Sequence, residues 1–184
     1  TMIPASNIVI AATHSHTGPL YWGALRDHFH AKAIAEHGED PCEPFDYAQQ
    51  FVDHLVRAIG EANQAAAPAD ITTGTAEQHG LSFNRRFHMK DGSVRFNPGV
   101  LNPDIVKPAG SIDPQVGIVM LRHPGADKPF AAVVNFALHL DTVGGTLYAA
   151  DYPYYLQEDL RKAYGQDFTP VSYTHLTLPT NREV

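Results

Sequence analysis

The sequence predicts an α/β fold, with α+β as the alternative, in which helices pack on a layered mixed β-sheet. Residues 45–66 repeat apolar side chains with the period of a helix. Residues 116–122 and 130–138 are β-rich runs separated by a short turn, as antiparallel neighbours would be. A chain of 184 residues with 43% hydrophobic content can bury one core, so we expect a globular domain.

The first half of the chain contributes two strands and two helices to this prediction. Residues 7–13 are almost continuously apolar, which predicts a strand covered on both faces. A long irregular stretch follows, with a short helix expected around residues 25–36. The helix over 45–66 has Asp46 at its start as a capping residue. Residues 71–78 alternate weakly and are expected to form the next strand.

The second half is rich in turns and ends in another helix. Asp91 and Gly92 stand between residues 87–89 and 94–96, and an Asp-Gly pair between two β-rich runs is typical of a hairpin. Residues 152–164 show the apolar spacing of an amphipathic helix.

One domain accounts for most of the chain. We expect residues 1–169 to form it, incomplete at both ends, because no linker or repeat divides them. Residues 170–184 continue neither the helix nor a strand pattern and look like translated sequencing-adapter read-through. The prediction is therefore a non-native tail after residue 169.

Composition excludes several classes of protein. Thirteen basic and 20 acidic residues give a net charge of −7, and no basic run is present, which argues against a nucleic-acid partner. No apolar run is long enough for a transmembrane segment. Cys42 is the sole cysteine and so has no partner for an internal disulfide. The oligomeric state stays open.

Histidines mark the candidate site. His14 and His16 follow the predicted strand of residues 7–13, where side chains two apart share a face. His139 closes the apolar run that begins at residue 130, so it also falls at the end of a strand. Neutral imidazoles are common zinc ligands, and two such positions favour a metal site at this edge of the sheet.

Two other functions are compatible with the same residues. A different zinc hydrolase or lyase would use His14, His16 and His139 as three ligands. A metal-free α/β binding module would use these histidines only for hydrogen bonds. The relative orientation of the rings of His14 and His139 separates the alternatives.

Four motifs occur in a characteristic order: Ala-Thr-His-Ser-His-Thr-Gly-Pro at 12–19, Asn-Arg at 84–85, Asn-Phe-Ala-Leu-His at 135–139 and Ala-Asp-Tyr-Pro at 150–153. Together they resemble the N-terminal domain of the neutral/alkaline, non-lysosomal ceramidases over nearly all of residues 1–169. The resemblance implies an α/β catalytic domain that holds one zinc ion. It also implies hydrolysis of the amide of ceramide-like N-acyl sphingoid lipids, and a secreted or periplasmic location.

The resemblance assigns roles residue by residue. His14 and His139 match the two histidine ligands of the zinc ion. His16 matches the other histidine of the active site, and Arg85 matches an arginine that steadies the substrate carbonyl. Arg86 stands where the family usually has serine. The family's glutamate and tyrosine ligands and its active-site serine have no counterpart here, so we expect this fragment to be inactive alone.

These roles form a consistent mechanism for metal-assisted hydrolysis. Zinc polarises the scissile carbonyl and activates water. His16 is suited to proton transfer near neutral pH, and Arg85 would stabilise negative charge on the carbonyl oxygen. Asp141 or Asp151 could accept the second N–H of a zinc histidine. Asp151 precedes the helix of residues 152–164 and could instead cap it.

Overall fold

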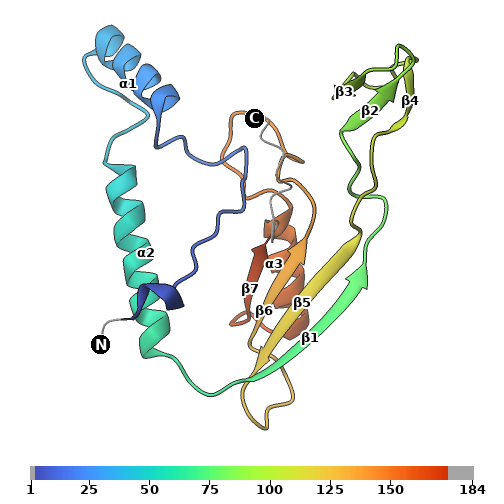
Figure 1. Cartoon of the computed structure of the whole chain (residues 1–184). Coiled ribbons are helices and arrows are strands. Elements are labelled where there is room, and N and C mark those ends of the chain that lie inside the picture. Colours follow the sequence, from blue (N-terminus) through green and yellow to red (C-terminus); the bar gives the residue numbers. More distant parts are fainter. Residues whose placement is uncertain (1–2, 174–184) are drawn as a thin grey trace.

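The computed structural model describes residues 3–173 and has an α/β fold, in which these residues form three α-helices and two separate β-sheets (Figure 1). The larger sheet has the strand order β1-β5-β6-β7. A second, three-stranded sheet has the order β3-β2-β4. The strands of the larger sheet are β1 (Asp70–Glu77), β5 (Gln115–Arg122), β6 (Ala131–Phe136) and β7 (Thr169–Tyr173).

The core lies between the larger sheet and helix α3 (Tyr152–Tyr164). Strands β5 and β6 are antiparallel, as the sequence predicts, whereas β6 and β7 are parallel and α3 connects them. The buried residues Ala132, Val134 and Phe168 form the centre of the core. Partly buried side chains of the neighbouring elements pack against them: Val116, Met120, Leu156, Leu160 and Tyr164. Strand β6 is therefore the best-shielded element of the sheet.

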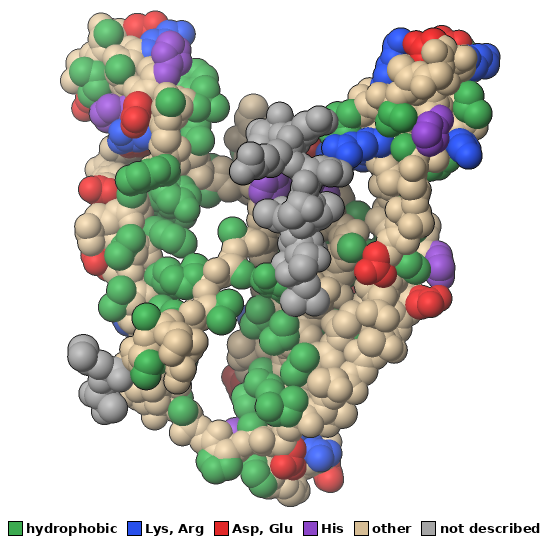
Figure 2. Space-filling view, in the orientation of Figure 1, with side chains coloured by type: hydrophobic (Ala, Val, Ile, Leu, Met, Phe, Trp, Pro, Cys, Tyr) green, Lys and Arg blue, Asp and Glu red, His purple; other side chains and the backbone are tan. Residues whose placement is uncertain are grey.

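The other two helices bury none of their residues. Helix α2 (Tyr47–Gln64) begins where predicted, and the carboxylate of Asp46 accepts a 2.9 Å hydrogen bond from the backbone N–H of Gln49. Helix α1 (Ala24–His37) is longer than expected and ends at Gly38, whose φ of 79° suits glycine. Neither packs against another described helix or strand. Figure 2 shows hydrophobic side chains gathered along α2. In residues 3–173 no helix combines the length and apolar character needed to cross a membrane.

The small sheet contains the predicted hairpin. Strands β2 (Arg86–Met89) and β3 (Val94–Phe96) are antiparallel around a turn in which Gly92 has a φ of 82°. Such a backbone conformation strongly favours glycine, so the Asp-Gly signal is confirmed. Strand β4 (Ile105–Pro108) pairs with β2 and has no counterpart among the predicted strands.

The strand predicted over residues 7–13 is wrong. The structure has a short 3₁₀ helix, η1 (Ala5–Asn7), and then extended backbone that belongs to no sheet. Val9 is 87% exposed, so the run is not covered on both faces. An apolar run forms a strand only where a neighbouring strand satisfies its backbone groups, and this segment pairs with neither edge of the larger sheet.

The sequence pattern also misplaces the end of the fold. Residues from 170 onward were expected to continue no strand, but Pro170–Tyr173 lie in β7 and pair with β6. The side chain of Asn135 adds a 2.9 Å hydrogen bond to the carbonyl of Tyr173. Residues 170–173 have little β-strand pattern in their sequence, and they form a strand because the edge of β6 is free to pair with them. The rest of the predicted tail, residues 174–184, lies outside the described residues.

Candidate metal centre

Three histidine rings from two distant parts of the chain meet at one place. The ring centroids of His14 and His16 are 4.9 Å apart, those of His14 and His139 are 5.0 Å apart, and those of His16 and His139 are 4.6 Å apart. One nitrogen of each ring lies within 4.8 Å of the other two. This spacing would allow a single cation to contact all three rings. His14, His16 and His139 can together hold a metal ion.

The backbone brings the rings together differently from the predicted way. His14 and His16 lie on an irregular segment instead of a strand, and His14 has a φ of +62°. The expectation that a strand would direct both side chains to one face is therefore wrong. His139 does follow a strand, three residues beyond the end of β6. The two segments are joined by a 3.2 Å hydrogen bond from the backbone N–H of His16 to the carbonyl of Leu140.

A second set of hydrogen bonds fixes the segment that carries His14 and His16. The carbonyl of Ala149 accepts hydrogen bonds from the hydroxyls of Ser15 at 3.1 Å and Thr17 at 2.8 Å. The N–H of Ala149 donates to the carbonyl of Thr17 at 3.2 Å. Thr17 is buried. These contacts could not be predicted from the sequence, because no local pattern connects residues 132 positions apart.

The surroundings of His139 favour the neutral imidazole, which is the form that binds a metal ion. Its Nδ1 is buried and has no hydrogen-bond partner among the described residues. Burial lowers the pKa of His139 below its usual value, and the positive charge of Arg85 and the nearby histidines lower it further. The ring is therefore held in its neutral form, which keeps a lone pair for a cation. A neutral ring with an unpartnered buried nitrogen, close to two other imidazoles, is compatible with a bound metal.

Asp141 lies beside His16, and Asp151 does not contact the rings. The Nδ1 of His16 is 3.7 Å from a carboxylate oxygen of Asp141, and both side chains are about half exposed. Asp151 is buried at the start of α3, where it accepts a hydrogen bond from the N–H of Tyr152. Of the two aspartates proposed to support a zinc histidine, Asp141 is thus near a ring, and Asp151 has the capping role.

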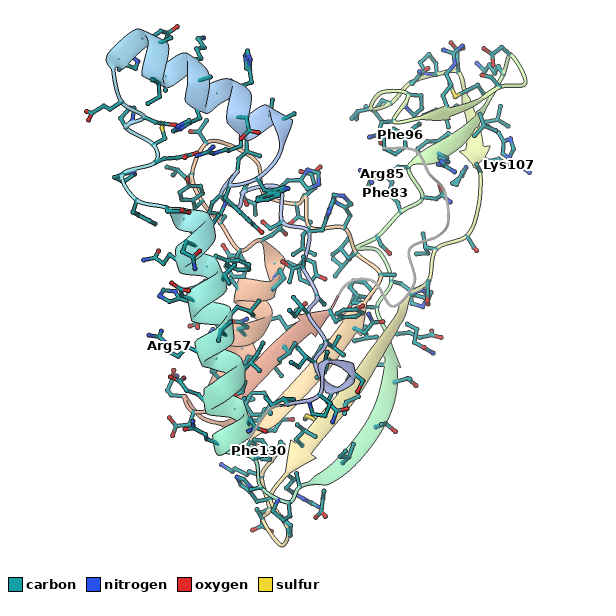
Figure 3. The ribbon with its side chains drawn as sticks, turned by 60° about the vertical axis from the view of Figure 1, so that its left-hand side comes forward. Arg57, Phe83, Arg85, Phe96, Lys107 and Phe130 are labelled. Atoms are coloured by element: carbon teal, nitrogen blue, oxygen red, sulfur yellow. The ribbon has the colours of Figure 1, made fainter. Side chains whose placement is uncertain are left out.

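Arg85 lies in the connection between β1 and β2, on the side of the small sheet. Its guanidinium carbon is 4.9 Å from the centre of the Phe96 ring, a cation–π contact that holds the side chain over β3 (Figure 3). Asn84 shapes the local backbone, because its side chain accepts a 2.9 Å hydrogen bond from the N–H of Arg86. Arg85 is close enough to His139 for its charge to influence that ring.

An aromatic pocket begins where the histidine segment ends. The cavity measures about 950 Å³ and is bounded by residues after Pro19, by the beginnings of α1 and α2, and by Tyr148. Its aromatic lining comprises Tyr21, Trp22, Phe45, Tyr47 and Tyr148. Ring centroids of Tyr21 and Tyr47 are 5.4 Å apart, which links the loop to α2. Because Tyr148 precedes Ala149, the pocket and the histidines share their supporting loops.

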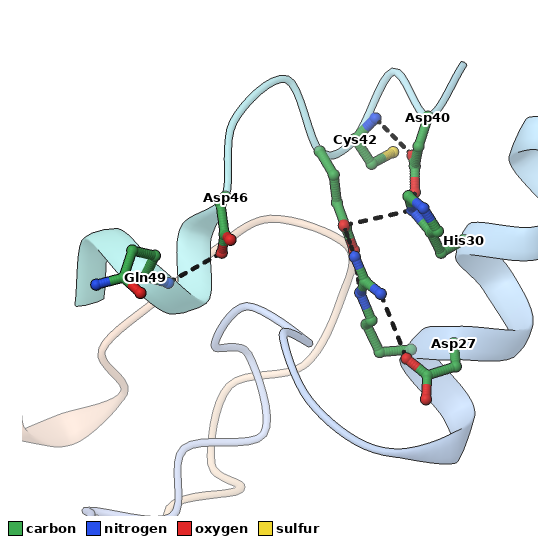
Figure 4. Close-up of polar contacts among 8 residues, drawn as sticks. Asp27, His30, Asp40, Cys42, Asp46 and Gln49 are labelled. Atoms are coloured by element: carbon green, nitrogen blue, oxygen red, sulfur yellow. Dashed lines mark hydrogen bonds and ion pairs between the residues drawn. The ribbon is translucent and has the colours of Figure 1, made fainter. Parts of the chain in front are cut away.

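A second cluster of possible metal ligands lies between α1 and the loop that follows it (Figure 4). His30 is on α1, and its Nδ1 is 2.9 Å from Asp40 and 3.4 Å from Glu43. Arg26 binds both carboxylate oxygens of Glu43, one of them at 2.8 Å. Arg26 and His30 already pair with the carboxylates of Asp40 and Glu43, so the charge of this cluster is balanced without a metal ion.

Comparison of the chain with protein-family models, with curated proteins and with solved structures found no match. The convergence of the three histidines is therefore the observation on which a function has to be built.

Proposed function

We propose that this chain contributes the zinc ligands of a hydrolase that cleaves the amide bond of ceramide-like N-acyl sphingoid lipids. The observation that carries the proposal is the convergence of His14, His16 and His139 within 4.8 Å. The order of the motifs around these histidines, which resembles that of the neutral/alkaline ceramidases, supports the choice of reaction.

His14 and His139 are the residues that would hold the metal. Zinc suits them because it prefers nitrogen ligands, and His139 is kept neutral by burial and by Arg85. When bound, zinc would act as a Lewis acid that polarises the scissile carbonyl.

His16 is placed for proton transfer. The carboxylate of Asp141 lies 3.7 Å from Nδ1 of His16 and would orient the ring by attracting its N–H. This arrangement leaves Nε2 to exchange a proton with the reacting group, first as a base and then as an acid towards the leaving nitrogen. Exposure of the His16 ring keeps that nitrogen accessible.

Arg85 provides a positive charge near His139. Phe96 holds the guanidinium in place, so little reorganisation is needed when charge develops on the carbonyl oxygen. The same charge helps to keep His139 neutral. Arg85 would therefore stabilise the negative charge that develops in the transition state.

The aromatic pocket supports a lipid substrate. A cavity of about 950 Å³ lined by Tyr21, Trp22 and Phe45 offers apolar surface for a long hydrocarbon chain. Trp22 is 80% exposed, so it offers that surface without first having to separate from a packed core. The pocket starts three residues after His16, close to where the amide would react.

A second function is favoured by one observation, the nearly equal spacing of the rings. Centroid distances of 4.6 to 5.0 Å place His16 as close to each neighbour as the neighbours are to one another. A different zinc hydrolase or lyase would use all three histidines as ligands and leave a fourth position for its substrate.

Zinc titration tests the metal part of the proposal. The chain should bind one Zn²⁺, and His14→Ala or His139→Ala should weaken binding by more than the 10- to 100-fold typical of a residue that only supports a ligand. His54→Ala, on the exposed side of α2, is the matched control and should change nothing. His16→Ala separates the candidates, because an equal loss would favour three ligands. If the chain binds no zinc, both the ceramidase-like function and the three-histidine alternative are contradicted.

Binding of a non-hydrolysable ceramide analogue tests the substrate part. The zinc-loaded chain should bind it, and Trp22→Ala should weaken the binding while zinc affinity stays the same. An analogue that binds the Trp22→Ala and unsubstituted chains equally would argue against this pocket as the lipid site.

A further inference from the structure

The loop that follows His139 is closed at its base by one buried carboxylate. Asp151 is only 2% exposed. One of its oxygens accepts hydrogen bonds from the backbone N–H groups of Thr142 at 2.9 Å and Val143 at 3.1 Å. The other accepts from the N–H of Tyr152 at 2.6 Å and from the hydroxyl of Thr142. Asp151 thus joins the beginning of the loop to its end.

Both ends of this loop hold the segment that carries His14 and His16. Near the beginning, the carbonyl of Leu140 accepts from the N–H of His16. Near the end, Ala149 exchanges hydrogen bonds with Thr17 and accepts another from Ser15. If the two ends of the loop separated, these two attachments could not both keep their present geometry. The closed loop therefore determines where His16 lies relative to His139.

Helix capping alone does not account for the conformation of Asp151. A capping residue usually has extended backbone and needs one side-chain hydrogen bond. Asp151 has φ of 59° and ψ of −158°, a region that favours glycine, and its carboxylate accepts four hydrogen bonds, two of them from Thr142. Residues keep such a conformation when surrounding contacts enforce it. Here those contacts come from the loop as well as from α3.

We infer that Asp151 is a positioning residue of the three-histidine site, which acts by holding the loop of residues 139–151 closed. The inference rests on the proposed function for its metal-binding readout, because Asp151 touches none of the rings. Residues hydrogen-bonded directly to a metal ligand typically change metal affinity by 10- to 100-fold, and we use this range as the scale for Asp151, which acts through the loop.

The test compares three substitutions in the full chain. Asp151→Asn keeps the size of the side chain but puts an amide N–H₂ where an oxygen accepts hydrogen bonds. Thr142→Val removes one bond on the loop side and leaves the cap of α3 intact. Asp159→Asn is the control, since Asp159 is an exposed residue of α3 whose carboxylate pairs with Lys162 at 2.9 Å.

Two readouts separate positioning from simple stabilisation. The first is affinity for Zn²⁺, together with the visible absorption spectrum of bound Co²⁺, which depends on the geometry of the ligands. The second is hydrogen exchange of the metal-free chain at the amides of His16 and Ala149, the two donors that attach the histidine segment to the loop.

The inference predicts a graded result. Asp151→Asn should weaken zinc binding about 10- to 100-fold and alter the Co²⁺ spectrum. Thr142→Val should act in the same direction with a smaller effect, and the double variant should be no worse than Asp151→Asn, because the two residues share one interaction. Exchange at His16 and Ala149 should become faster in both variants and stay unchanged in Asp159→Asn.

A different pattern would overturn the inference. If Asp151 only caps α3, Asp151→Asn will speed exchange in the first turn of the helix while zinc affinity and the amides of His16 and Ala149 stay as they were. If the unsubstituted chain binds no zinc, the proposed function fails, and the exchange rates still decide whether Asp151 positions the rings. Thr142→Val decides the question if Asp151→Asn does not fold.

Discussion

Residues 3–173 contain two clusters of possible metal ligands, and they differ in charge and in support. At the first, His14, His16 and His139 gather three imidazoles, with Asp141 as the nearby carboxylate. At the second, His30 lies between two carboxylates that Arg26 helps to neutralise. The comparison shows that two clusters with equally close ligand atoms can differ in whether those atoms already have partners. We expect a cation at the first cluster, where Nδ1 of His139 has no hydrogen-bond partner among the described residues, and none at the second, where the carboxylates already have cationic partners.

Their structural support differs as well. His139 is next to Leu140, which is completely buried, and follows β6, the best-shielded strand. His30 is on α1, which packs against no other described helix or strand. A preorganised site requires ligands on rigid supports. In the first cluster His139 is supported by the core, and His14 and His16 are supported by hydrogen bonds of their segment to Leu140 and Ala149. The second cluster depends mainly on its own ion pairs.

The largest effect is expected from the support of the first cluster. Leu140→Ala removes a fully buried side chain and should lower the free energy of unfolding by about 2–5 kcal/mol. Zinc affinity should fall too, because the carbonyl of residue 140 fixes His16. Denaturant unfolding with and without zinc measures both. Leu147→Ala, at an 82% exposed position of the same loop, is the control and should change stability by less than about 0.5 kcal/mol.

The next effect separates the clusters directly. His139→Ala should abolish tight zinc binding, whereas His30→Ala should leave the affinity unchanged, because the pairing of His30 with Asp40 and Glu43 is already satisfied without a metal. Competition with a chromophoric chelator gives both affinities. The comparison would fail if the two substitutions weakened zinc binding equally.

Removing a positive charge should make the second cluster resemble the first. Arg26→Ala leaves two carboxylates and one histidine without their cationic partner, a set of ligands that Zn²⁺ and Mn²⁺ accept. We expect the number of bound zinc ions to rise from one to two per chain. Equilibrium dialysis with metal analysis measures this number. A folded Arg26→Ala chain that still binds one ion would show that charge balance is not what excludes the metal.

A smaller, pH-dependent effect is expected at Asp40. Burial favours a higher pKa, but hydrogen bonds from the Cys42 N–H and His30 outweigh it and hold the pKa of Asp40 below its ordinary value of 3.8. Its ionised form therefore stabilises the folded chain above about pH 4, and this contribution is lost as the pH falls through the lowered pKa.

Thermal unfolding across the acid range tests this sign. Asp40→Asn should lower the unfolding temperature at pH 7, and the difference from the unsubstituted chain should shrink towards pH 3. A difference that stays constant or grows on acidification would contradict the role of the charged carboxylate.

The sequence predicted the elements whose local signals and tertiary packing agree. Residues 47–64 combine a capping Asp46 with helical periodicity, and the hairpin has an Asp-Gly turn, so both formed as expected. Residues 7–13 had only apolar character, and the identity of a neighbouring strand is not encoded locally. Strands β4 and β7 were missed for the same reason, since each forms on an edge that another segment supplies.

The histidine cluster was anticipated for a reason that was only partly right. The position of His139 after an apolar run did indicate the end of a strand. His14 and His16 reach the same place through a positive φ and through hydrogen bonds to Leu140 and Ala149, not through strand geometry. Contacts between residues more than 120 positions apart have no sequence pattern, so these hydrogen bonds could not be predicted. Asp151 was expected to support a zinc histidine or to cap a helix, and the structure shows the cap together with hydrogen bonds to Thr142 and Val143.

X-ray absorption at the zinc edge of the loaded chain tests the central claim most directly. The account predicts at least two imidazole nitrogens at about 2.0–2.1 Å, and their loss in His139→Ala but not in His30→Ala. Zinc surrounded by oxygen alone, or imidazole ligands that disappear with His30, would show that the converging rings of His14, His16 and His139 are not a metal centre.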